Sequence, residues 1–285
     1  MDSFSFSAVL AALSAGCAAA AMAGGFVPPV EKPLRLPDVS DHPYLRLLIF
    51  IAILAALLFL PAAFLTAAAF LGADLRRLAE DTQALLCALA LLAAYALVLP
   101  PALLLLRRFE GPSGLEGVWP FWSNPGTQAP RPTWKDLVLG LLAWGACLPL
   151  LSCCKLAGEM LVRWAGLPEH ENPILTALDR QPRVSVFLCL LFTVAVLVPI
   201  AEELAYRGFL YGGLRRLMKF PAAWLISAVF FGAIHSIPAD FPALLAMGLL
   251  FAWLYERTGR LSAPIACHAV NNLVTLLLAG SGSGR

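Results

Sequence analysis

Two adjacent glutamates and an arginine lie in a part of the chain that is otherwise apolar. Glu202 and Glu203 follow the run 184–198, which has no charged residue, and Arg207 comes four residues after Glu203. On a helix, Glu203 and Arg207 would share a face and pair, whereas Glu202 would point about 100° away and stay free. Ionisable groups at membrane depth are rare and are usually functional. The alternative is a helix start, with Pro199 and two acids in the first turn.

Two histidines lie in apolar sequence further along the chain. His235 ends one apolar run, four residues after Phe231, and His268 lies within another, four residues before Asn272. Each pair would share a helix face. A single buried histidine is usually a satisfied core residue, because an unpaired imidazole in apolar surroundings is costly. Two histidines, with a carboxylate and an amide on separate helices, instead predict a shared polar site.

These residue types can hydrolyse an amide. A carboxylate in a desolvated pocket has a raised pKa and can take a proton from water as that water attacks a carbonyl carbon. An imidazole can hold the water, while an amide N–H and a second imidazole can donate to the oxyanion. One glutamate and two histidines are also the ligand types of catalytic zinc, although no H-E-x-x-H motif is present. We favour a glutamate base with no cofactor; zinc held by Glu202, His235 and His268 is the alternative.

The composition indicates a polytopic membrane protein. The 285 residues are 60% hydrophobic and 13% charged, whereas soluble domains are nearer 45–50% and about 25%. We therefore expect an all-α membrane helical bundle of about eight transmembrane helices. The candidate runs are 4–23, 47–71, 84–106, 137–154, 184–198, 221–237, 241–255 and 262–279. Basic residues are scattered between these runs, so no nucleic-acid partner is expected.

The loops and the smaller residues give further expectations. More loop lysines and arginines fall inside if the N-terminus is outside, which is the orientation we predict. No positive charge precedes the run 4–23, so an uncleaved first helix is expected rather than a signal peptide. Residues 158–183 are interpreted as an interfacial helix plus a loop. Gly208 and Gly212 form a G-x-x-x-G face, which predicts a close helix contact.

Taken in order, three motifs resemble those of a known family. Glu202-Glu203-x-x-x-Arg207, Phe231-x-x-x-His235 and His268-x-x-x-Asn272 are similar to the motifs of the CAAX-protease and bacteriocin-processing (CPBP, Abi) intramembrane endopeptidases. The resemblance covers residues 137–279, which are interpreted as the catalytic domain. Residues 1–136, with their own membrane helices and loops, match nothing, and residues 280–285 are expected to form a flexible tail.

The resemblance implies roles for the motif residues. Glu202 would activate water that His235 positions, and His268 and Asn272 would donate to the oxyanion. Glu203 and Arg207 would give structural support. The substrate would be a membrane-anchored protein or peptide, prenylated in eukaryotic members of the family, and the protein would lie in the bilayer of a bacterial cell membrane. The alternatives are a metal-dependent version of the same protease, a transporter, for which no internal repeat is found, or an immunity protein of the same fold.

Overall fold

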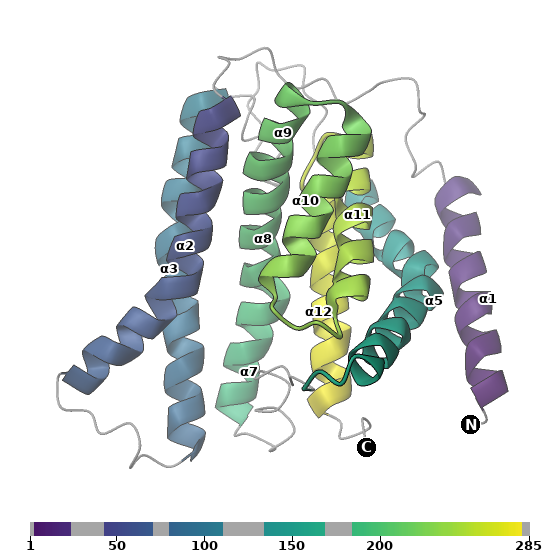
Figure 1. Ribbon diagram of the computed structural model, residues 1–285, viewed down its shortest axis with the longest axis horizontal. Helices are drawn as coiled ribbons and strands as arrows, with labels where there is room; N and C mark the ends of the chain where they lie inside the picture. The colour runs from purple at the N-terminus through teal and green to yellow at the C-terminus, as the bar shows by residue number, and fades with distance from the viewer. Residues whose placement is uncertain (1–2, 24–42, 71–79, 111–133, 169–183, 281–285) are drawn as a thin grey trace.

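The computed structural model describes residues 3–23, 43–70, 80–110, 134–168 and 184–280 (Figure 1). Every regular element in these ranges is a helix, so the predicted all-α polytopic fold is confirmed. The helices outside the central one are α1 (Ser3–Ala23), α2 (Pro43–Phe70), α3 (Glu80–Glu110), α5 (Trp134–Trp164), α10 (Phe220–Ile234), α11 (Phe241–Thr258) and α12 (Ser262–Gly280).

Five stretches of the described residues are long and apolar enough to cross a membrane. They are Pro43–Ala67, Leu85–Leu105, Trp134–Trp164, Val184–Leu217 and Ser262–Ala279. Each of the eight apolar runs coincides over most of its length with a helix of the described residues, but fewer are full-length spans. α10 has 15 residues, and α11 carries Glu256 and Arg257 in its last turn. About 20 apolar residues are needed to span the hydrocarbon core, so these two helices are short for that purpose.

The predicted interfacial helix at 158–183 is wrong in its first part. Residues 158–164 continue α5 without a break, and residues 169–183 lie outside the described ranges. Two contacts explain the longer helix. Lys155 pairs with Glu159 one turn later, at 3.8 Å, and it also contacts Asp240 in the α10–α11 connection. Charged contacts on the exposed side of α5 thus accompany its last turns.

One continuous helix runs through the centre of the bundle and contains two π-helical stretches. It consists of α7 (Val184–Phe192), the π-helix η2 (Thr193–Leu197), α8 (Val198–Glu203), the π-helix η3 (Leu204–Tyr211) and α9 (Gly212–Leu217). Helices α2 and α3 lie on one side of it, and α10, α11, α12 and α5 lie on the other (Figure 1). Short π-helical stretches occur frequently at functional sites. The two glutamates end α8, between the two π-helices.

The N-terminal helices are tied to this central helix by a buried side chain. Arg46 of α2 is buried, and its Nη1 donates to the carbonyl oxygen of Gly208 at 3.2 Å. The predicted close contact at Gly208 and Gly212 is found at one of the two. A Cβ at Gly208 would meet Leu204 Cδ1 at an ordinary 3.5 Å, whereas a Cβ at Gly212 would meet Nη1 of Arg46 from α2 at 3.3 Å. A closer helix approach occurs at Gly248 of α11, where a Cβ would meet Ala228 Cα at 2.9 Å.

Candidate active site

Glu203 and Arg207 form a fully buried ion pair, as their spacing of four residues predicts. Arg207 Nη1 lies 3.0 Å from Glu203 Oε1, and both side chains are 0% exposed. The other end of the guanidinium donates to the carbonyl oxygen of Gly248 at 3.0 Å. Its carbon lies 4.8 Å and 5.0 Å from the ring centroids of Phe231 and Phe251. Hydrogen bonds and ring contacts therefore fix this arginine on several sides, which is what a buried charge requires.

Glu202 differs from its neighbour. Its side chain is 17% exposed, and its Oε2 has no hydrogen bond among the described residues. His268 Nε2 lies 3.9 Å from Oε2 of Glu202. The helix therefore separates two adjacent carboxylates. Glu203 forms an ion pair with Arg207, and Glu202 remains available to a water molecule or a substrate.

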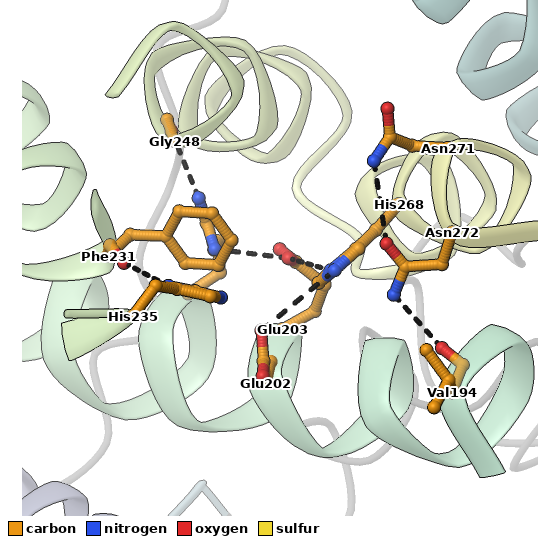
Figure 2. Close-up of polar contacts among 10 residues, drawn as sticks. Val194, Glu202, Glu203, Phe231, His235, Gly248, His268, Asn271 and Asn272 are labelled. Atoms are coloured by element: carbon orange, nitrogen blue, oxygen red, sulfur yellow. Dashed lines mark hydrogen bonds and ion pairs between the residues drawn. The ribbon is translucent and has the colours of Figure 1, made fainter. Parts of the chain in front are cut away.

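His268 contacts both glutamates from α12. Its Nδ1 lies 3.0 Å from Glu203 Oε1, and its Nε2 faces Glu202 (Figure 2). A carboxylate only accepts hydrogen bonds, so Nδ1 of this histidine donates to Glu203. The ring also stacks on Phe251, with centroids 4.9 Å apart and planes 22° apart. Glu203 and Phe251 together fix the plane of the imidazole and direct Nε2 toward the free carboxylate.

His235 occupies the C-cap of α10, where the helix stops. Its Nδ1 lies 2.7 Å from the carbonyl oxygen of Phe231, and because a carbonyl can only accept, Nδ1 is the donor. Nε2 is then an acceptor when the ring is neutral, which suits it to hold a water molecule. The helix stops because Ser236 has φ 55, a left-handed conformation that costs a non-glycine residue about 1–2 kcal/mol. Backbone strain of this kind clusters at functional sites.

The ring of Phe231 joins the two histidines. His235 and His268 have ring centroids 5.0 Å and 5.8 Å from it. The two imidazoles therefore lie no further apart than the sum of these distances, within the limit of about 12 Å for groups sharing one water and one carbonyl. Figure 2 shows them approaching the glutamate pair from opposite sides of the view. Three motifs that are far apart in the sequence thus meet around one point.

Asn272 is held by the first π-helix. Its Nδ2 donates to the carbonyl oxygen of Val194 at 2.9 Å. This carbonyl is free for a reason in the sequence. The N–H of Val198, its α-helical partner, donates to Thr193 instead. The N–H five residues on, which a π-helix would use, is missing because that residue is Pro199. The π-helix and the proline together create an acceptor for the asparagine.

Glu202, His235 and His268 are the candidate zinc ligands. Among the described residues, no group of three or more His, Cys, Asp or Glu side chains is placed to hold a metal. Tetrahedral zinc needs three protein ligands at about 2.0–2.2 Å. Glu202 and His268 Nε2 lie 3.9 Å apart, and Nε2 of His235 is free because its Nδ1 donates to Phe231. Both histidines thus keep a possible ligand nitrogen, but the three side chains are not gathered closely enough to form a zinc site as placed.

Sequence reasoning did not find the residues of α11 that support the site. Gly248 and Phe251 hold Arg207, and Phe251 also stacks on His268. Gly248 and Phe251 are three residues apart on an apolar helix. Any buried helix face shows this spacing, so it does not mark a functional site. Tyr206 was also missed. Its ring packs against Phe231, and its buried hydroxyl has no hydrogen bond among the described residues.

The segment that carries the candidate site is similar to a known protein family. Residues 184–274 match the family model described as Type II CAAX prenyl endopeptidase Rce1-like. The predicted resemblance is confirmed over this segment. It contains the whole central helix, α10, α11 and the part of α12 that carries His268 and Asn272.

Two bacterial relatives share a region of similar length. The chain is 37% identical over 113 residues to the protein named "Putative membrane peptidase YdiL" of Bacillus subtilis, covering 39% of this chain and 43% of that protein. It is 30% identical over 111 residues to the membrane-embedded CAAX protease MroQ of Staphylococcus aureus, covering 37% and 42%. The chain thus spans less than half the length of each relative. No solved structure gives a significant match.

Proposed function

We propose that the protein is an intramembrane endopeptidase of the CAAX type, which hydrolyses a peptide bond of a membrane-anchored protein or peptide with water activated by Glu202. The observation that carries this proposal is the division of labour between two adjacent carboxylates. Glu203 is fully buried and paired with Arg207 and His268, whereas Glu202 is 17% exposed, has no arginine or lysine partner among the described residues, and faces an imidazole 3.9 Å away. The similarity of residues 184–274 to Rce1-like endopeptidases supports the same function.

The proposed reaction begins with proton transfer to Glu202. Glu202 takes one proton from a water molecule whose other hydrogen is donated to Nε2 of His235, and the water oxygen attacks the scissile carbonyl carbon. The carbonyl oxygen becomes an oxyanion, to which Asn272 donates from its amide. Collapse of this intermediate breaks the C–N bond, and Glu202 passes its proton to the leaving amine. Donation from His268 Nε2 would require both ring nitrogens to carry protons, because Nδ1 already donates to Glu203.

Zinc is the second candidate for water activation, since glutamate and histidine are its ligands in other hydrolases. We favour the glutamate base, because Glu202 lies beside a carboxylate already paired with an arginine. An ion would require His235 to approach Glu202 and His268 through Nε2, the nitrogen left free by its bond to Phe231. Glu202 would then be a ligand instead of a base.

The test is a cleavage assay in liposomes. Purified protein is reconstituted and given two fluorescence-quenched peptides of the same sequence, one farnesylated at its cysteine and one anchored by a palmitoyl chain. Mass spectrometry then identifies the cleaved bond. We expect cleavage of at least one peptide by the wild type and none by Glu202→Gln. The matched control is Glu159→Gln, a neutralised glutamate on the exposed side of α5, which should cleave normally. Failure of the wild type on both peptides, or full activity of Glu202→Gln, would contradict the proposal.

A further inference from the structure

Two adjacent asparagines link the site to α5 through a chain of hydrogen bonds. Trp144 Nε1 donates to Asn271 Oδ1 at 3.3 Å, and Asn271 Nδ2 donates to Asn272 Oδ1 at 3.4 Å. Asn272 Nδ2 then donates to the carbonyl oxygen of Val194 at 2.9 Å. Figure 2 shows the last three members of this series. We call it the amide relay.

The direction of the amide relay is determined by its two ends. An indole nitrogen can only donate a hydrogen bond, so the atom of Asn271 that faces Trp144 must be the oxygen. The nitrogen of Asn271 then faces Asn272, whose facing atom must be its oxygen. The nitrogen of Asn272 consequently faces Val194, and a backbone carbonyl can only accept. Reversing either amide would place two donors or two acceptors against each other at two contacts.

The amide relay leaves one hydrogen atom of Asn272 unused. The carboxamide has two N–H groups and one oxygen. Val194 takes one N–H, and Asn271 takes the oxygen. The second N–H has no acceptor among the described residues, and it belongs to the same α12 side-chain face as His268, four residues earlier. It is therefore the donor available to a substrate carbonyl.

We propose that Trp144 and Asn271 are positioning residues, which hold the amide of Asn272 so that its free N–H, and not its oxygen, faces the oxyanion. The proposal rests on the function proposed above. A freely rotating amide would present its oxygen part of the time and would repel the developing charge. Trp144 lies outside the segment 184–274 that matches the family model. A helix outside the matched region thus helps to define the reactive geometry.

The decisive variant is Asn271→Asp, which keeps the size of the side chain and its acceptor for Trp144. The aspartate has no N–H to donate to Asn272 Oδ1, and its second carboxylate oxygen attracts Asn272 Nδ2 instead. The amide group of Asn272 should therefore rotate by about 180°. We expect kcat on whichever peptide the wild type cleaves to fall by about 10²-fold with KM little changed, since loss of one oxyanion donor costs about 10²–10³-fold. In an Asn272→Ala background the same change should cost less than about 3-fold, because Asn271 acts only through Asn272.

A second readout does not depend on turnover. In protein labelled with 15N-tryptophan, the indole N–H resonance of Trp144, assigned with Trp144→Phe, should move upfield in Asn271→Leu because its acceptor is lost. Trp144→Phe should lower kcat by about 10-fold. The matched control is Trp224→Phe, which removes an indole bond to the carbonyl oxygen of Leu249 between α10 and α11 and should leave kcat nearly unchanged.

The outcomes separate this inference from the proposed function. An unmoved Trp144 resonance in Asn271→Leu, or an undiminished effect of Asn271→Asp in the Asn272→Ala background, would overturn the positioning role. Absence of cleavage by the wild type would overturn the proposed function, and the resonance would still decide whether the amide relay forms.

Discussion

Replacement of Arg207 by methionine tests whether the buried ion pair supports the fold. The arginine is fully buried, donates to Glu203 and to the carbonyl of Gly248 at 3.0 Å each, and lies between two phenylalanine rings. Arg207→Met fills a similar volume but leaves the carboxylate of Glu203 buried without its cation. Breaking such a pair costs about 3–5 kcal/mol. His268 remains 3.0 Å from Glu203, so we expect the lower half of that range.

The assay is unfolding in mixed micelles, titrated with sodium dodecyl sulfate and followed by the fluorescence of the seven tryptophans. The double variant Glu203→Gln/Arg207→Met removes both charges and should regain part of the lost free energy of unfolding, because no uncompensated carboxylate remains. The control is Arg215→Met. Its partner Glu256 is 13% exposed and keeps the hydroxyl of Tyr211, so a smaller loss of about 2 kcal/mol is expected. A loss below about 1 kcal/mol for Arg207→Met, or a double variant less stable than the single one, would refute the reasoning.

Four further outcomes are expected. Glu202→Gln should abolish peptide cleavage in liposomes while the unfolding midpoint stays near that of the wild type, because this carboxylate has no ion pair with a lysine or arginine among the described residues; a large loss of stability would show that it has a structural role. Pro199→Ala should supply an N–H that competes with Asn272 for the carbonyl of Val194, and should therefore lower kcat without unfolding the protein. Ser236→Gly should relieve the left-handed strain and raise the free energy of unfolding by up to about 1 kcal/mol. Dialysis against a chelator should leave cleavage intact under the glutamate-base mechanism; stoichiometric zinc in active protein, with activity lost on its removal and restored on its return, would favour the metal mechanism.

The sequence predicted the parts of the site that obey helical spacing. Glu203 and Arg207 are four residues apart and lie on the same face, and the apolar runs define every helix that carries a motif residue. Convergence of the motifs was also predictable in outline, because each polar group in an apolar helix requires a partner. The sequence could not identify the partners. Gly248 and Val194 take part through backbone carbonyls, which every residue has, so no side-chain pattern marks them.

The π-helices were beyond sequence reasoning for a related reason. Pro199 after an apolar run predicts a helix start, and the structure instead places it inside one continuous helix. The bond from Val198 to Thr193 lets the chain pass the proline by taking one more residue in that turn. The number of membrane spans was also beyond the sequence. The apolar runs in α10 and α11 predict helices, but composition alone does not tell whether a short apolar helix spans the bilayer or packs among the other helices.

The bond from Arg46 to Gly208 crosses the division between residues 1–136 and 137–279. This arginine lies outside the segment that matches the family model, yet its guanidinium contacts the helix that carries both glutamates. The N-terminal residues therefore pack directly against the helix that carries the candidate site. If the gene is divided between residues 110 and 134 and the two fragments are produced together, they should reassemble in the membrane through helix contacts such as that of Arg46 with Gly208. The longer, motif-bearing fragment produced alone should be degraded.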